Sequence, residues 1–234
     1  MLWAVAVVTD YVGIFVSGAS GWRLPAPAHF AERHQLVVIV AIGESIVSVG
    51  LGLDGAPVTW SLLLGGVLGI SVSIALWWTY FDVVALVAER TLAALEGDAR
   101  TRLGRDTFTY LHMPVVVGIV YLALGTKVVL AQVAAVADHQ HATFSGAALF
   151  ALYGGAALYL VAMSAVRWRD VGSPNWQRLV VAAGLVAIGV GAELAKLTGL
   201  VNLAFVAGVL VCLVAYEALR FKDVREHVRH TEPV

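Results

Sequence analysis

The stretch HFAERHQLVVIVAIGESIVSVGLGL, residues 29–53, begins like the charged end of a helix and continues as an apolar run with one acid in its middle. Between Leu36 and Leu53, Glu44 is the only ionisable residue. At about 1.5 Å of rise per residue, the run is long enough to cross most of a hydrocarbon core roughly 30 Å thick. The stretch therefore predicts a membrane-spanning helix with a charge close to mid-depth.

The composition indicates that the whole chain is built in this way. Of its 234 residues, 60% are hydrophobic and 13% are charged, and the mean hydropathy is +0.85. These values are typical of a polytopic membrane protein, whose main partner is the lipid bilayer. The formal net charge of −1 supplies no basic field, so we expect no nucleic-acid partner. The single cysteine, Cys212, excludes a disulfide within the chain and a cysteine-based metal site.

Apolar segments separated by Gly, Pro and charged residues predict about seven helices. The first segment contains Asp10 and has no positive charge before it, so we interpret it as a membrane helix rather than a cleavable signal peptide. The sequence predicts an all-α, polytopic membrane protein in which residues 1–234 form one domain. Its helices are expected near residues 2–17, 30–53, 58–88, 107–136, 144–167, 177–197 and 200–221.

Lys and Arg concentrate on alternate connections between these helices. They occur at Arg23, within residues 90–105, at residues 167–169 and within residues 220–229, whereas the DHQH loop falls on the opposite face. Because cytoplasmic loops carry an excess of Lys and Arg, this pattern predicts a cytoplasmic C-terminus and an N-terminus outside.

Small residues predict where helices approach closely. Gly65 and Gly69 form a GxxxG pattern, and Ala183, Ala187 and Gly191 form a row of small residues at intervals of four. Both patterns are typical of contacts between membrane helices.

Glu44 is the strongest candidate for a functional residue, because an ionisable group inside a membrane is costly. Arg33 lies eleven residues earlier and returns to nearly the same helix face, with His29 one turn before it and Ser48 one turn after Glu44. We expect this stripe to face the interior of the bundle rather than lipid. Asp10 and Lys127 are predicted at similar depth.

A structural explanation of the same charges stays open. Arg33 would pair with Asp82 or Glu32, and Lys127 with Glu44 or Asp10. Glu193 would pair with Lys196 one turn away. The sequence contains no GxSxG, P-loop, CxxC or HExxH motif, so it predicts no catalytic centre, no metal and no cofactor.

Three segments in the same order resemble a known family. HFAERHQLVVIVAIGESIV, WWTYFD at residues 77–82 and YLHMPVVVGIV at residues 110–120 resemble the bacterial low temperature requirement protein A family. The resemblance implies a multi-pass protein of the bacterial plasma membrane that is linked to growth at low temperature. Family members commonly begin with a further helix of the type ELFFDLVFVFA, so the resemblance also implies a chain shortened at its N-terminus.

The motif positions of the family fall on residues of all three segments, among them Tyr80, Asp82, His112 and Pro114. We expect Pro114 either to lie in the first turn of its helix or to bend the helix and free a carbonyl. Together with the charges at depth, these positions give one predicted intramembrane polar site: Asp10, His29, Glu32, Arg33, Glu44, Tyr80, Asp82, His112 and Lys127.

Two functions lead among those compatible with these residues, and a membrane-embedded enzyme comes third. The first is a transporter or channel for a small solute or ion, with Glu44 as the intramembrane acid. The second is a non-transporting membrane sensor or scaffold whose charges form a structural network of ion pairs. The sequence identifies neither the solute nor the oligomeric state.

Overall fold

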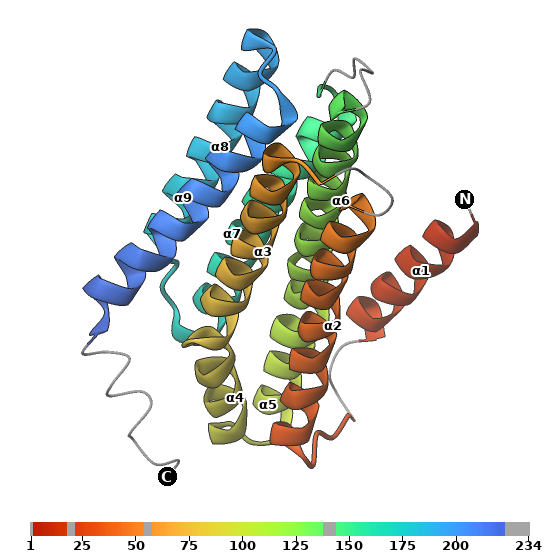
Figure 1. Cartoon of the computed structure of the whole chain (residues 1–234). Helices are drawn as coiled ribbons and strands as arrows, with labels where there is room; N and C mark the ends of the chain where they lie inside the picture. The colour runs from red at the N-terminus through yellow and green to blue at the C-terminus, as the bar shows by residue number, and fades with distance from the viewer. Residues whose placement is uncertain (1, 18–21, 54–57, 138–143, 223–234) are drawn as a thin grey trace.

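The computed structural model describes residues 2–17, 22–53, 58–137 and 144–222 (Figure 1). The DHQH loop and the basic residues beyond Lys222 therefore lie outside the described residues. In chain order the described elements are α1 (Leu2–Ser17), α2 (Pro27–Leu53), α3 (Trp60–Phe81), α4 (Val84–Ala94), α5 (Gly97–Leu103), the π-helix η1 (Gly104–Leu111), α6 (His112–Ala137), α7 (Ala147–Val171), α8 (Trp176–Ala195) and α9 (Gly199–Arg220).

The described part of the chain contains helices and no strands, which confirms the predicted all-α membrane fold. Six helical segments are long and apolar enough to cross a bilayer, whereas α1 has 16 residues and is shorter than these segments. The six are Pro27–Leu51, Trp60–Ala94, Gly97–Ala135, Ala147–Val171, Trp176–Ala195 and Gly199–Arg220. The orientation and the number of seven spans stay predictions.

The predicted start of one helix and the continuity of another were wrong. The helix expected near residues 107–136 begins at Gly97 and passes through η1, because Leu103 is buried in a small core that makes the polar stretch around it fold as a helix. The helix expected near residues 58–88 is interrupted at Asp82 and Val83 and continues as α4 to Ala94.

The connections that carry arginines gather at one end of the bundle, here called the arginine-rich end. This end holds the start of α2, the α4–α5 connection, the α7–α8 connection and the end of α9. The first two lie at the bottom of Figure 1, and the last two lie higher, toward the left. α3 has 22 residues, about 33 Å at 1.5 Å per residue, which matches the thickness of a hydrocarbon core. The break that follows α3 therefore lies near the membrane boundary, and α4 and α5 extend beyond it.

The described residues form two hydrophobic cores, one along the bundle and one at the arginine-rich end. The larger core joins α2, α3, α6, α7, α8 and α9 along the bundle. A smaller core at the arginine-rich end contains Ala31, Ala88, Leu92, Leu103 and Phe108. We call the part of the chain around this smaller core the cap.

Candidate functional site

A buried ion pair lies where α8 begins and α9 ends. The Nε and one terminal nitrogen of Arg178 each donate to a carboxylate oxygen of Glu217, both at 2.8 Å. The whole of Arg178 is 5% exposed, and the side chain of Glu217 is 12% exposed. Two parallel charge-assisted hydrogen bonds of this kind fix the orientation of both side chains.

Asn175 positions this pair. It is the N-cap of α8, and its side-chain oxygen accepts a hydrogen bond from the backbone N–H of Arg178 at 3.4 Å. Its amide nitrogen also donates to Glu217 at 3.3 Å. The N-cap places Arg178 in the first turn of α8, and this first turn directs the guanidinium toward α9.

The break after α3 supplies a further acceptor for Arg178. In a continuous helix the carbonyl of Thr79 would accept from the N–H of Val83, but Val83 has φ −137° and ψ −40°, outside the helical region. A terminal nitrogen of Arg178 donates instead to the carbonyl of Thr79 at 3.1 Å. Arg178 therefore joins α8, α9 and the interrupted end of α3.

A second buried contact holds the end of α3 against α7. Tyr159 donates to the carbonyl of Leu76 at 2.8 Å, and its hydroxyl lies 2.9 Å from the hydroxyl of Thr79. Tyr159 is fully buried. The carbonyls of Leu76 and Thr79, near the end of α3, thus have side-chain partners from two other helices.

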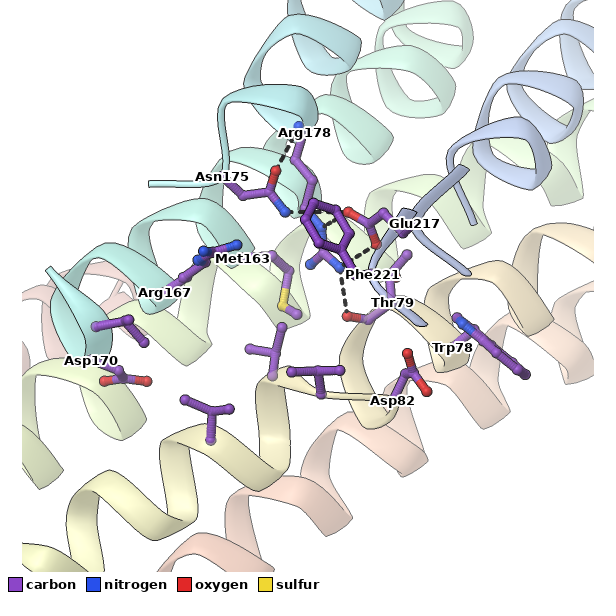
Figure 2. Close-up of a pocket in the computed structure, with 14 residues that line it drawn as sticks. Trp78, Thr79, Asp82, Met163, Arg167, Asp170, Asn175, Arg178, Glu217 and Phe221 are labelled. Carbon is purple, nitrogen blue, oxygen red and sulfur yellow. Dashed lines mark hydrogen bonds and ion pairs between the residues drawn. The ribbon is translucent and has the colours of Figure 1, made fainter. Parts of the chain in front are cut away.

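A cavity of about 330 Å³ opens beside the break in α3. Figure 2 shows Arg178 reaching toward Glu217 and Thr79, with Asp82 and Asp170 on opposite sides of the view. The wall is mostly apolar and contains these charged groups at a few positions. The lining residues are Trp78, Thr79, Asp82, Val83, Val84, Val87, Met163, Arg167, Asp170, Val171, Asn175, Arg178, Glu217 and Phe221.

On the opposite wall of the cavity, the end of α7 is hydrogen-bonded to η1. Thr107 donates its hydroxyl to Asp170 at 2.6 Å, and Thr107 is fully buried. Next to it, Asp106 accepts two hydrogen bonds from Arg169 at 3.0 and 3.2 Å. Asp170 therefore keeps a fixed position through a partner on the π-helix.

The π-helix connects Asp170 with a buried histidine. His112 lies 2.8 Å from the carbonyl of Thr107 through Nδ1 and 2.7 Å from the hydroxyl of Tyr80 through Nε2. A carbonyl can only accept, so Nδ1 donates and Nε2 accepts from Tyr80 in the neutral imidazole. Thr107 therefore contacts His112 through its carbonyl and Asp170 through its hydroxyl.

Pro114 lies in the first turn of α6, which begins at His112. Of the two predicted roles of Pro114, a position in the first turn of its helix is the one that these bounds match. Just before this turn, the hydroxyl of Tyr11 on α1 donates to the carbonyl of Thr109 at 3.4 Å.

The structure brings together only part of the predicted polar site. Tyr80 and His112 form a direct hydrogen bond, and Asp82 lines the cavity. The remaining members are exposed on the described chain: Asp10, His29, Glu32, Arg33, Glu44 and Lys127.

The expectation that Glu44 faces the interior was wrong. Arg33 and Glu44 do share one face of α2, but that face points outward, and Glu44 only accepts a hydrogen bond from Ser48 at 3.3 Å among the contacts of the described residues. The interior positions of α2 are occupied by small and apolar residues, including Val38, Ala41 and Val49. Periodicity gives the shared face of two residues, but it does not show which face the neighbouring helices cover.

The alternative ion pairs have mixed outcomes. Glu193 and Lys196 form the predicted pair at 3.0 Å. Glu32 lies 3.4 Å from His29 rather than beside Arg33. Among the described residues, Lys127 is not within ion-pair distance of either Glu44 or Asp10.

Sequence reasoning missed the central pair of the cavity. Glu217 is the only acid in the apolar stretch from Gly199 to Arg220, and Arg178 is the only base in the helix from Trp176 to Ala195. The argument applied to Glu44, that a lone charge in an apolar helix needs a partner, also selects these two residues. No group of three or more metal-ligating side chains occurs in the part of the chain that the structure describes.

Comparison with known proteins places the chain in a family. A family model described as "Bacterial low temperature requirement A protein (LtrA)" matches residues 1–215, so the chain belongs to this family. An uncharacterised protein of Rhizobium meliloti (strain 1021), RA0937, is 31% identical over 175 residues. The match covers 68% of this chain and 39% of that relative. No solved structure matches the chain.

Proposed function

We propose that this membrane protein of the low temperature requirement A family moves a small solute or ion across the bacterial plasma membrane through the cavity beside the break in α3. The observation that carries the proposal is the position of the cavity, where an interrupted helix meets charged side chains inside a helical bundle. Interrupted helices are a recurrent way of building solute and ion sites in membrane transporters. The family name leads us to propose further that this transport is needed at low temperature.

The charges on the wall favour a cation. Asp82, Asp170 and Glu217 face two arginines, Arg167 and Arg178. Because Arg178 and Glu217 neutralise one another, two acids and one base remain, and the remaining wall carries one net negative charge. A cavity of one charge sign with low-dielectric walls concentrates ions of the opposite sign.

The proposal assigns transport to Asp82 and Asp170 rather than to Glu44. Both line the cavity, whereas Glu44 does not. Asp170 has a fixed position through Thr107, and this hydrogen bond leaves other lone pairs of the carboxylate for a solute. Thr107 contacts Asp170 through its hydroxyl and His112 through its carbonyl, and these contacts hold Asp170 in place beside the cavity.

Flux measurements on the purified chain in vesicles test the proposal. Vesicles that contain the protein should conduct H⁺, Na⁺ or K⁺ faster than empty vesicles under an imposed membrane potential. Asp82→Asn and Asp170→Asn should each lower that flux at least about tenfold, because each removes a charge that attracts the cation. Glu193→Gln, at the far end of α8, is the matched control and should leave flux unchanged. Absence of flux for all three ions, or flux that neither aspartate variant alters, contradicts the cation proposal.

One observation favours the second function, a membrane sensor or scaffold. Arg178 is so fully hydrogen-bonded to Glu217 and to the carbonyl of Thr79 that the pair holds three helices together without any ligand. A protein of this kind would keep the same fold in the aspartate variants and show no flux in any of them.

A further inference from the structure

Two charges of opposite sign lie exposed on the outer surface of the bundle, within the apolar parts of α2 and α6. Both Glu44 and Lys127 are exposed, and neither forms an ion pair with another described residue. Glu44 lies nine residues before the end of α2, and Lys127 lies ten residues before the end of α6. At these depths hydrocarbon would surround both charges if lipid alone covered this surface, which is unfavourable.

Glu44 lies on the edge of α2 that borders α6. Gln35 contacts Glu89 on α4 and Val49 packs at Gly69 on α3, so these two residues mark the side of α2 that faces α3 and α4. With 3.6 residues per turn, Glu44 is rotated by about 180° from Gln35 and about 140° from Val49. α2 packs extensively against α6 on its other flank, where the ring of His34 contacts that of His112.

Lys127 lies on the corresponding edge of α6. Gly118 and Gly125 face α7, where an added Cβ would meet the backbone of Tyr159 and Leu152. Lys127 is rotated from Gly118 and Gly125 by about 180° and about 160° respectively, so it points away from α7. His112, whose ring contacts that of His34 on α2, is rotated by only about 60° from Lys127. Glu44 and Lys127 therefore border the same outer surface between α2 and α6.

The offset in depth between the two charges is within the reach of their side chains. Val49 and Thr126 both approach Gly69, so these two residues lie at about the same level. Lys127 is then about six residues, or about 9 Å, further from the arginine-rich end than Glu44. Because long side chains on a helix point back toward its N-terminus, the ammonium of Lys127 leans toward the level of Glu44.

We propose that a second copy of this chain covers this outer surface between α2 and α6, and that Glu44 of each copy pairs with Lys127 of the other. A two-fold axis along the membrane normal keeps both copies in the same orientation and places the same surface against itself. A surface with one acid and one base is self-complementary under this rotation, and the two pairs remove all four charges from hydrocarbon. The inference concerns the outer surface and does not depend on the function of the cavity.

Charge reversal in the full chain tests this dimer. Single-molecule photobleaching of fluorescently tagged protein, in vesicles of increasing lipid content, measures the dimer dissociation constant. Glu44→Lys and Lys127→Glu should each raise that constant about tenfold or more, because each creates two pairs of like charges. The double variant with both reversals should recover dimerisation to within about threefold of the native chain. The uncharged variants Glu44→Gln and Lys127→Met should also weaken the dimer, and they serve if a reversed variant fails to fold.

The control and the contrary results are equally specific. Glu193→Gln removes an acid outside this surface and should leave the dissociation constant unchanged. A native chain that is monomeric at every lipid content overturns the proposal, since lipid or a different protein then covers the surface between α2 and α6. A native dimer that none of the four single variants weakens, or a folded double variant that does not dimerise, also overturns it.

Discussion

The contact between Arg178 and Glu217 shows how much a single buried pair determines in this fold. Arg178 receives its position from the N-cap Asn175 and gives hydrogen bonds to α9 and to the end of α3. If Glu217 is removed, a guanidinium remains buried with only the carbonyl of Thr79 as a described acceptor. The loss of one partner of a buried pair is expected to cost more than the loss of both.

We predict that Glu217→Leu lowers the free energy of unfolding by about 3 to 5 kcal/mol, because it leaves Arg178 buried and uncompensated. The double variant Arg178→Met with Glu217→Leu should recover most of this loss. Unfolding of the purified chain in mixed micelles by increasing detergent gives the free energies. Arg169→Met breaks a half-exposed pair with Asp106 and should cost less than about 1 kcal/mol. Equal losses in the single and double variants would show that Arg178 does not need Glu217.

At this scale the sequence indicated some partners and missed others. The pairing of Glu193 with Lys196 follows from their spacing within one turn, and the structure contains it. The pairing of Arg178 with Glu217 joins residues that are 39 positions apart, and nothing in the local sequence selects one partner among the distant acids. Tyr80 and His112 were predicted as members of one site through a family resemblance, whereas their hydrogen bond depends on the register of two helices.

The contact of α6 with α7 is the closest helix approach described here. A Cβ added at Gly125 would lie 2.6 Å from the backbone nitrogen of Leu152, and one at Gly155 would lie 2.5 Å from that of Leu122. Backbone atoms cannot move aside as a flexible side chain can. The two glycines therefore permit a backbone contact that no larger residue allows.

We predict that Gly125→Ala and Gly155→Ala each destabilise the chain by about 1 to 3 kcal/mol, because the added methyl separates α6 from α7. Gly184→Ala is the matched control, since a Cβ there meets nothing within 4 Å. The detergent unfolding assay used for Glu217 compares the three variants. If Gly184→Ala proves as costly as the other two, helix propensity or the membrane environment, and not the close approach, governs the effect.

At the scale of helices, sequence periodicity located most elements but not their interruptions. The expected small-residue contact at Gly65 and Gly69 is buried, with Leu130 and Val49 against it. The expected row of Ala183, Ala187 and Gly191 is exposed instead. Small residues permit close packing, but they do not specify which helix takes advantage of it.

The break between α3 and α4 has no local signal such as Gly or Pro. The residues around it are Phe81, Asp82 and Val83, and a hydropathy pattern continues through them. The carbonyl that the break frees is bound by Arg178, which lies almost one hundred residues later. The interruption is therefore stabilised by tertiary contacts, and a local sequence pattern could not show it.

For the whole molecule, the apolar composition was sufficient to predict a helical membrane protein. It was not sufficient to predict the cap, whose core depends on Leu92, Leu103 and Phe108 meeting from separate segments. The candidate site also depends on the whole bundle, since the cavity is lined by residues of α3, α4, α7, α8 and α9. Of the charged residues in the predicted site, Asp82 lines the cavity and the others are exposed on α1, α2 and α6, because the packing of neighbouring helices decides which charges face inward.

Access to the cavity from the two sides of the membrane is the measurement that tests the transport proposal most directly. Val87 lines the cavity on α4, and Cys212 is the only natural cysteine. A Val87→Cys variant in a Cys212→Ala background can be treated with a water-soluble thiol reagent from either side of sealed vesicles. Val190→Cys, on the exposed face of α8 and outside the cavity lining, serves as the control and should react slowly from both sides.

If the cavity belongs to a transport pathway, Val87→Cys reacts rapidly from the arginine-rich side and also reacts from the opposite side, because the pathway opens in turn to each. Reaction from one side only under every ion gradient, or no reaction at all, would contradict the proposal and leave the structural role of the Arg178–Glu217 pair as the better account of the site.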